Sequence, residues 1–391
     1  MAITDKEEGV WILPQVYNKQ MEGDIWDYTE IFELFGWGHN QYSGGVGNNS
    51  TSNVSSPIQI PGTWASVSHA GTGRLRLGTR TDGTLWSWGY NVHGQLGQNE
   101  SYPVRNAYSS PIQIGSGTDW STEQVAVGQG IRHVGAIKTD GTLWQWGNNN
   151  NGQLGQNSTH PGNNGLSSPT QVGTDTTWSA ITGGDSTSIA LKTDGTMWAW
   201  GYNAYGSLGQ NDTSPYSSPK QVGTNTNWSK INGTGNLSAI STDGSLFTWG
   251  YNANYGQLGH NNKTEYSSPR QVPGTWKQIS NSPPGTVIAV RTDGTLWSWG
   301  RNSYGNLGQN NTTEYSSPKQ IGTGTDWDYV TAKGYGGFAI KTDGTLWSWG
   351  RASSGSVGND ANINMSSPIQ IPGSYKYVEG GYETGFALKT T

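Results

Sequence analysis

The sequence predicts an all-β protein, a seven-bladed β-propeller with four-stranded antiparallel blades whose ring closes by pairing of the N- and C-terminal strands. Three observations predict it: a unit of about 50 residues recurs seven times, six of the units contain an Asp-Gly hairpin signal, and the remaining unit is divided between the chain ends. Such a period is typical of solenoids and propellers. The 391 residues include 59 glycines and 20 tryptophans, but only 13% are charged.

Four recurring features define the unit. A Trp-Gly pair is followed after six or seven residues by Gly-x-Leu/Val-Gly, then by Ser-Ser-Pro, and an aromatic residue lies seven to nine residues past that proline. Successive Trp-Gly pairs are 51, 58, 54, 49, 50 and 50 residues apart. Every tryptophan beyond residue 30 occupies a repeat position. The Trp-Gly tryptophans are Trp37, Trp88, Trp146, Trp200, Trp249, Trp299 and Trp349.

Each unit offers four short strands, which together make a propeller blade. Thr-Asp-Gly-Thr/Ser is predicted to form a type I′ hairpin turn, because Asp and Gly both tolerate positive φ. Strands are expected before this turn, as at 188–192, and after it, as at 84–88, where aromatic and β-branched residues are frequent. Two more are expected around Ser-Ser-Pro and after the following aromatic residue, as at 276–279. The turn aspartates are Asp82, Asp140, Asp194, Asp243, Asp293 and Asp343.

The seventh unit is divided between the two chain ends. Residues 385–390 match the strand before the turn, and residues 33–38 match the strand after it. We therefore expect residues 31–38 to complete blade seven with residues 365–391, which would close the ring and leave few exposed strand edges. Residues 31–391 are assigned to the propeller, and residues 1–30 to a separate acidic N-terminal arm.

The arm differs from the propeller in charge. The first 35 residues contain eight acidic and two basic side chains, a net charge of −6, whereas the rest sum to +1. The chain has no apolar signal region at its start and no apolar run of about 18 residues, so neither secretion nor membrane insertion is expected. The overall charge of −5 argues against nucleic-acid binding. The arm residues expected to dock on another protein are Trp11, Ile12, Leu13, Val16, Tyr17 and Trp26.

The sequence contains no recognisable catalytic or metal centre. It has no cysteine, and its six histidines are scattered over different units. The turn aspartates lie in different blades, whereas Ca²⁺ needs about six or more converging oxygen ligands. Neither a Gly-x-Ser-x-Gly elbow nor a His-Glu-x-x-His motif occurs. We therefore predict a non-enzymatic protein with no cofactor and no metal; an enzyme acting on a glycan or a nucleotide is a third, unsupported alternative.

Positions at which the repeat varies are candidates for partner binding. Because all units share one orientation, the residues that follow Trp-Gly gather on one face of the disc. Tyrosine and arginine, which combine large contact area with a polar group, are favoured at interfaces. The tyrosines before Ser-Ser-Pro, such as Tyr216 and Tyr266, are interpreted instead as packing residues. The candidate partner-binding residues of the propeller face are His39, Tyr90, Tyr202, Tyr251, Arg301 and Arg351.

Residues 81–97, Thr-Asp-Gly-Thr-Leu-Trp-Ser-Trp-Gly-Tyr-Asn-Val-His-Gly-Gln-Leu-Gly, resemble the repeat core of the RCC1 family of seven-bladed β-propellers. The resemblance extends over residues 31–391 and implies the fold, while the family spans unrelated activities. Its founding activity, nucleotide exchange on the nuclear GTPase Ran together with chromatin binding, is not expected. Family members of that kind carry a basic N-terminal tail, whereas this arm is acidic, and no unit is long enough to hold an inserted wedge.

Residues 9–20, Gly-Val-Trp-Ile-Leu-Pro-Gln-Val-Tyr-Asn-Lys-Gln, are similar to N-terminal segments of bacteriophage virion proteins. This resemblance implies a virion structural protein, made in the host cytoplasm and anchored to other virion proteins through residues 1–30. The propeller would be a docking platform on the tail or tail fibre, with its loops facing a host-surface protein or glycan. The alternatives are a phage head decoration protein and a bacterial RCC1-like protein-binding module that acts as an inhibitor or adaptor.

Overall fold

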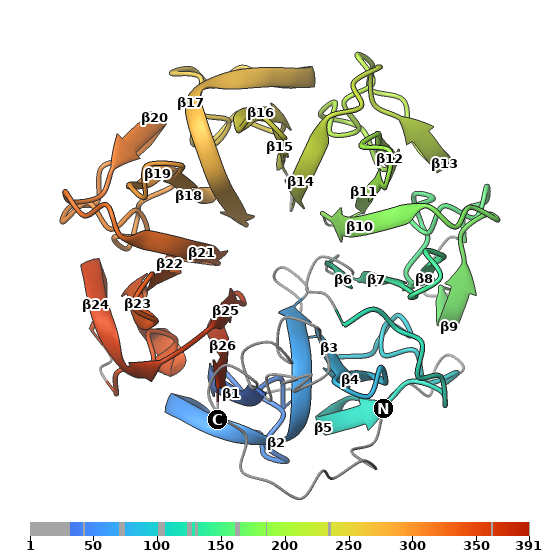
Figure 1. Ribbon diagram of the computed structural model, residues 1–391, viewed down its shortest axis with the longest axis horizontal. Coiled ribbons are helices and arrows are strands. Elements are labelled where there is room, and N and C mark those ends of the chain that lie inside the picture. The colour runs from blue at the N-terminus through green and yellow to red at the C-terminus, as the bar shows by residue number, and fades with distance from the viewer. Residues whose placement is uncertain are drawn as a thin grey trace, which may run out of the picture.

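The computed structural model describes residues 32–41, 44–69, 75–100, 106–122, 127–129, 132–160, 165–184, 186–233, 236–360 and 363–390. These residues form antiparallel sheets that are arranged radially around a central axis as a disc (Figure 1). Within these ranges the one helical segment is a single 3₁₀ turn, η2 (Ser353–Gly355). The predicted all-β class is therefore confirmed.

The strands follow one another along the chain with short connections. The first half of the described chain contains β1 (Phe32–Gly38), β2 (Val54–His69), β3 (Leu75–Arg80), β4 (Leu85–Gly89), β5 (Tyr108–Gln113), β6 (Val127–Gln129), β7 (His133–Ile137), β8 (Leu143–Gly147), β9 (Leu166–Gln171), β10 (Trp178–Gly183), β11 (Thr187–Lys192), β12 (Met197–Gly201) and β13 (Tyr216–Gln221). The second half contains β14 (Trp228–Gly233), β15 (Asn236–Ser241), β16 (Ser245–Gly250), β17 (Tyr266–Ser282), β18 (Thr286–Arg291), β19 (Leu296–Gly300), β20 (Tyr315–Gln320), β21 (Trp327–Lys333), β22 (Gly336–Lys341), β23 (Thr345–Gly350), β24 (Met365–Ser374), β25 (Tyr377–Gly380) and β26 (Thr384–Thr390).

Two long strands, β2 and β17, each belong to two blades. The first part of β17 pairs with β16, and its second part, from Trp276, pairs with β18. The strand β2 is shared in the same way between β1 and β3. Dividing both strands gives seven four-stranded blades, as predicted. We number them blade 1 (second part of β2, β3–β5), blade 2 (β6–β9), blade 3 (β10–β13), blade 4 (β14–β16, first part of β17), blade 5 (second part of β17, β18–β20), blade 6 (β21–β24) and the closing blade (β25, β26, β1, first part of β2).

The closing blade joins the two ends of the described chain, which lie side by side in Figure 1. Strand β1 pairs with β26 over its whole length, from Phe32 opposite Thr390 to Gly38 opposite Thr384. Ring closure is therefore confirmed. The predicted range 365–391 is corrected at one point, because β24 pairs with β23 and is the outer strand of blade 6. The Ser-Ser-Pro strand completes the blade of the preceding Trp-Gly strand, so the C-terminal share of the closing blade starts at β25.

The Trp-Gly tryptophans join neighbouring blades. All seven are fully buried, with 0% of their surface exposed. Each indole lies against the last glycine of the Gly-x-Leu/Val-Gly loop in the preceding blade; a Cβ added at Gly155 would lie 3.0 Å from Trp200 Nε1. A larger residue at this position would displace the indole. Six of the seven indole N–H groups also donate a hydrogen bond to a carbonyl of that loop, as Trp249 does to Ser207 O at 2.9 Å.

The Asp-Gly turns differ from the prediction. Gly83 has a φ of +78°, whereas Asp82 is not among the residues with positive φ. Gly83 N–H donates to Arg80 O and Arg80 N–H donates to Thr84 O, both at 3.0 Å, which defines a three-residue loop with a glycine bulge. The type I′ prediction is wrong because the Asp82 carboxylate accepts hydrogen bonds from the backbone and hydroxyl of Thr84, at 3.0 and 2.6 Å. In this Asx geometry only the glycine needs a positive φ.

Candidate protein-binding surface

Two kinds of loop share one face of the disc, which we call the loop face. The long loop after each Trp-Gly strand lies beside the short loop between the two innermost strands of the same blade, since Thr187 and Gly201 are paired at those ends. The Asp-Gly turns lie on the opposite face, the turn face. In five blades the residue after Trp-Gly donates its backbone N–H to the short loop: His39 to Glu383 O, Asn148 to Arg132 O, Tyr202 to Ser186 O, Arg301 to Gly285 O and Arg351 to Tyr335 O.

Four of the six predicted residues belong to a row of aromatic and cationic side chains on the loop face. The row begins in blade 3, where the Tyr202 and Tyr205 rings are 6.4 Å apart. It crosses to blade 4 through Tyr205 and Tyr251, whose ring centroids are 4.9 Å apart. Burial raises the pKa of Tyr251, and electrostatic contributions from Tyr205, Glu265 and Tyr255 add to this effect.

The row continues through two arginines in blades 5 and 6. The Arg301 guanidinium lies 5.2 Å from the ring centroids of both Tyr255 and Tyr335. The Arg351 guanidinium lies 5.2 Å from both Tyr304 and Tyr335. Tyr335 then reaches the closing blade, where its hydroxyl bonds that of Tyr382. We call this set the tyrosine–arginine band: Tyr202, Tyr205, Tyr251, Tyr255, Arg301, Tyr304, Tyr335, Arg351 and Tyr382.

The two arginines differ in charge compensation. Arg351 forms an ion pair of 3.1 Å with Glu383, whose carboxylate also accepts a hydrogen bond from the Ser353 hydroxyl. Arg301 donates its Nε–H to Ser303 Oγ at 3.1 Å, and no acidic side chain of the described chain forms an ion pair with it. The band therefore carries one positive charge without a counter-charge. Its most accessible members are Tyr202 and Tyr205, which are 40% and 43% exposed.

Sequence reasoning found the band in part. The predicted residues include the four band members that follow Trp-Gly, but not Tyr335 or Tyr382. These two tyrosines lie in the short loops Lys-Gly-Tyr-Gly and Gly-Gly-Tyr-Glu, where the only signal is a tyrosine beside glycine in a blade-specific insertion. His39 and Tyr90 occupy the same repeat position in the closing blade and blade 1, outside the set of residues that defines the tyrosine–arginine band. The six arm residues lie outside the described residues.

The tyrosines that precede Ser-Ser-Pro are packing residues, as interpreted from the sequence. Tyr216 and Tyr266 pack against one hydrophobic cluster that includes Trp228 and Trp249. Their hydroxyls are also occupied within their own loops; Tyr216 donates to Asp212 at 2.7 Å, and Tyr108 donates to Glu100 at 2.6 Å. These side chains therefore stabilise the long loops.

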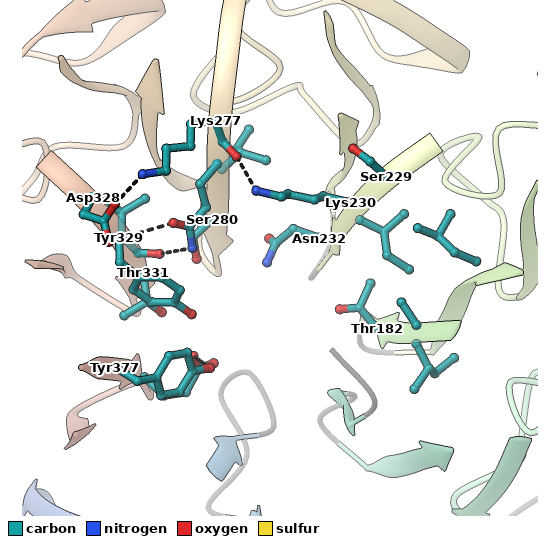
Figure 2. A pocket seen from close by; sticks show the side chains of 18 of the residues that line it. Thr182, Ser229, Lys230, Asn232, Lys277, Ser280, Asp328, Tyr329, Thr331 and Tyr377 are labelled. Atoms are coloured by element: carbon teal, nitrogen blue, oxygen red, sulfur yellow. Dashed lines mark hydrogen bonds and ion pairs between the residues drawn. The ribbon is translucent and has the colours of Figure 1, made fainter. Parts of the chain in front are cut away.

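A cavity of about 590 Å³ lies at the centre of the disc between the innermost strands β10, β14, β17, β21 and β25 (Figure 2). Its charged groups bind one another across strands: Lys277 forms an ion pair with Asp328, and Lys230 donates to the Lys277 carbonyl at 2.6 Å. Tyr377 donates to Glu379 at 2.9 Å. No histidine is among its lining residues. The arrangement is that of an inner wall held together by polar contacts.

Two buried cations lie on either side of the closing blade. In blade 6, Lys333 Nζ donates to Ser356 O at 2.9 Å, and burial lowers the pKa of this lysine to about 7. In blade 1, Arg76 donates to Leu75 O at 2.7 Å and to the Thr384 hydroxyl of the closing blade. Burial lowers the pKa of Arg76 to about 9, against the attraction of Glu379.

The described residues do not gather into a metal site: no three His, Asp or Glu side chains lie close enough to hold an ion. The turn aspartates are engaged locally, since hydrogen bonds from the Thr142 hydroxyl and backbone hold the pKa of Asp140 below its usual value. The described part of the chain also has no helix with the length and apolar character needed to cross a bilayer.

A protein-family model described as Regulator of chromosome condensation (RCC1) repeat matches residues 82–134, 140–191, 194–240, 243–283 and 293–332, more than half of the chain. A second model with the same description matches residues 178–207. The chain belongs to the RCC1 repeat family. Each of the five segments begins at a turn aspartate and continues into the next blade, so the family unit is offset from the structural blade by two strands.

The curated relatives are longer than the segments that match this chain. The chain is 26% identical over 182 residues to the human E3 ubiquitin-protein ligase HERC2, which corresponds to 46% of this chain and 4% of that protein. It is 28% identical over 179 residues to the ultraviolet-B receptor UVR8 of Arabidopsis thaliana, or 45% of this chain and 39% of the receptor. The chain thus spans well under half the length of the curated relatives it matches.

Solved structures share the fold over nearly the whole chain. Human WBSCR16 superposes with a TM-score of 0.79 at 20% identity and covers 92% of this chain and 99% of its own. Yeast RCC1 (Prp20), solved bound to Kap60, also gives a TM-score of 0.79, at 18% identity, covering 93% of this chain and 90% of its own. At these identities the similarity establishes an RCC1-type propeller.

Proposed function

We propose that this chain is a non-enzymatic protein-binding module that docks a partner on its loop face. One observation carries the proposal: the tyrosine–arginine band gathers tyrosines and arginines of blades 3 to 6 and of the closing blade on the loop face. Tyrosine and arginine dominate interface hot spots because each joins a large contact area to a polar group. Related propellers support it, since yeast RCC1 was solved in complex with another protein.

The band is ordered before any partner binds. Ring contacts of about 5–6 Å connect its members, and backbone hydrogen bonds fix the residues that follow Trp-Gly onto the short loops. A surface that is already ordered loses less side-chain entropy on association, a cost of about 0.5–1.5 kcal/mol for each mobile side chain that must be immobilised.

The proposal is tested by comparing two variants of the full chain. Tyr205→Ala with Tyr251→Ala removes the aromatic part of the band, while Ile363→Ala truncates a loop-face side chain that is 71% exposed and outside the band. The wild-type chain is used to capture partner proteins from the cells that make it. Each captured protein is identified and purified, and its binding to the wild type and to both variants is measured by titration. The double variant is expected to weaken binding at least tenfold and Ile363→Ala to leave it unchanged. Equal binding by both variants would refute the proposal.

A finer proposal places the module in a bacteriophage virion, with residues 1–30 as its anchor. It is supported by the sequence of the arm alone. A tagged chain should co-sediment with purified particles, and removal of residues 1–30 should release it while the propeller still binds its loop-face partner. A bacterial inhibitor or adaptor would bind its partner without the arm and would show no association with particles.

A further inference from the structure

We propose that Arg301 recognises a carboxylate of the docked partner, so that the loop face selects a protein segment that presents both an acidic residue and an aromatic or apolar one. The inference rests on the proposed function and adds the chemistry of the partner. It starts from the unequal partners of the two arginines in the tyrosine–arginine band.

The Arg301 guanidinium has N–H donors that bind no acceptor among the described residues. A guanidinium has five N–H donors, and the described residues engage only Nε–H, through Ser303 Oγ. Arg351, which occupies the same repeat position 50 residues later, is neutralised by Glu383 at 3.1 Å. The two free nitrogens of Arg301 therefore form the open edge of a planar fork, which matches the two oxygens of a carboxylate.

The Arg301 side chain is also held in place. Its guanidinium lies 5.2 Å from two tyrosine rings, Tyr255 in blade 4 and Tyr335 in blade 6. Cation–π contacts at this distance are individually weak, but together they restrict a side chain that otherwise has many rotamers. An anion that binds here contacts a guanidinium whose side chain has already lost conformational entropy.

The neighbouring surface defines the rest of the ligand. Tyr202 and Tyr205 of blade 3, 40% and 43% exposed, offer aromatic area on the same face, and Tyr251 and Tyr255 of blade 4 lie between blade 3 and Arg301 of blade 5. Glu265 lies close enough to Tyr251 to influence its pKa, so a second carboxylate of the ligand is disfavoured at that end. The complementary segment therefore places its acid at Arg301 and an aromatic or apolar side chain over the exposed tyrosines.

The experiment uses the full chain and a random copolymer of glutamate and tyrosine as the probe, with a lysine–tyrosine copolymer and heparin as comparison probes. Binding of each immobilised probe is measured by interferometry for the wild type, Arg301→Gln and Arg301→Lys. The matched control is Arg270→Gln, which removes the same charge from an arginine that lies 4.6 Å from the Tyr266 ring, on the first part of β17, the outer strand of blade 4.

Arg301→Gln is expected to weaken binding of the glutamate–tyrosine copolymer about tenfold, or roughly 1.4 kcal/mol, and Arg270→Gln to change it less than twofold. Arg301→Lys, which keeps the charge but not the planar fork, should lie between them. Equal loss in Arg301→Gln and Arg270→Gln, or no binding of the copolymer by the wild type, would overturn the inference.

Three further outcomes would also overturn it. Preferential, Arg301-dependent binding of heparin would assign the site to sulfated glycans, and self-association abolished by Arg301→Gln would assign it to a second copy of the chain. If Tyr205→Ala abolished copolymer binding while Arg301→Gln had no effect, docking on the loop face would stand and carboxylate recognition would fail. Failure of the proposed function itself would appear separately, as unchanged partner binding by the tyrosine double variant.

Discussion

Six blade junctions and the closing junction all bury a Trp-Gly indole, but the hydrogen bonds around that indole differ. At the six, an indole N–H donates to a loop carbonyl of the preceding blade at 2.8–3.1 Å. At the junction of blade 6 with the closing blade, Trp37 lies against Gly358 in the same way, but its Nε1 has no hydrogen-bond partner in the described chain. The equivalent carbonyl, Ser356 O, accepts from Lys333 instead.

The closing junction therefore buries a cationic side chain, Lys333, where the other junctions bury neutral groups. Lys333 is 1% exposed and lies 4.7 Å from the Phe338 ring, which itself packs edge-on against Trp37 at 5.4 Å. On the other side of the closing blade, Arg76 is 2% exposed and lies 5.0 Å from the Phe386 ring. A buried cation costs free energy unless hydrogen bonds and counter-charges offset its desolvation.

Ring closure therefore depends more on the pairing of β1 with β26 than on the interface between the closing blade and blade 6. The closing blade is assembled from chain ends that are distant in sequence, and its seven paired positions between β1 and β26 supply backbone hydrogen bonds. Its interface to blade 6 contains a charged group in place of the usual indole bond. We therefore expect the closing junction to be the part of the ring most sensitive to truncation and to pH.

The largest effect is expected from deleting residues 385–391, which removes most of β26. The deletion exposes the edges of β1 and β25 and removes Phe386 and Leu388, which are at most 1% exposed in the intact ring. The chain should melt at least ~10 °C lower, or fail to fold, in a calorimetric scan. Removing residues 1–30, which precede β1, controls for the loss of terminal chain. An unchanged melting temperature after removal of β26 would contradict closure by strand pairing.

The next largest effect is expected from Lys333→Met, and it should depend on pH. The folded pKa is lowered from 10.5 to about 7, so the unfolded state binds more protons between these values and wild-type stability rises with pH across that window. The shift corresponds to at most about 5 kcal/mol. The variant should therefore be more stable than the wild type below pH 7, with the advantage shrinking towards pH 10. Urea unfolding at a series of pH values measures it.

The matched substitution is Lys341→Met in the same blade. Lys341 is partly exposed and pairs with Asp326 at 3.1 Å on the turn face, and exposed pairs contribute little. This variant should show no comparable gain in stability at low pH. If both lysine variants followed the same pH profile, burial of the Lys333 ammonium would not be the cause.

A smaller effect separates the two kinds of junction directly. Trp249→Phe removes the indole bond to Ser207 O, while Trp37→Phe removes no hydrogen bond to the described residues. Both indoles are fully buried, so the loss of packing is similar. Trp249→Phe should destabilise the protein by about 1–2 kcal/mol more than Trp37→Phe, because it leaves a buried carbonyl without its donor. Equal unfolding free energies would remove this distinction between the junctions.

The smallest effect is expected at an Asp-Gly turn, which the closing blade lacks because its β26 and β1 come from opposite ends of the chain. In Asp194→Ala the carboxylate no longer accepts the hydrogen bonds of Thr196, which lower the pKa of Asp194 in the folded state. Its contribution is therefore present above the unfolded pKa and is lost as pH falls through the folded value. A slightly lower melting temperature at pH 7 that converges with the wild type in acid would agree. A difference that persists in acid would point to another cause.

The repeat predicted the architecture because its signals are local. Blade number, the hairpins, the buried tryptophans and the pairing of 33–38 with 385–390 all follow from short motifs at a fixed period. Two details were wrong: the turn type, since the Asp82 carboxylate binds Thr84, and the assignment of β24, which belongs to blade 6. Neither detail can be read from composition, because each depends on which hydrogen bonds form.

Sequence alone determined the toroidal fold and the shared face on which the variable positions lie. Only the tertiary structure decided that Tyr335 stands between Arg301 and Arg351, that Glu383 neutralises just one of these arginines, and that Lys333 replaces an indole at the closing junction. The physical reason is the same in each case. These contacts join different blades and come from residues that depart from the repeat, so their partners follow from side-chain direction across a junction and not from periodicity.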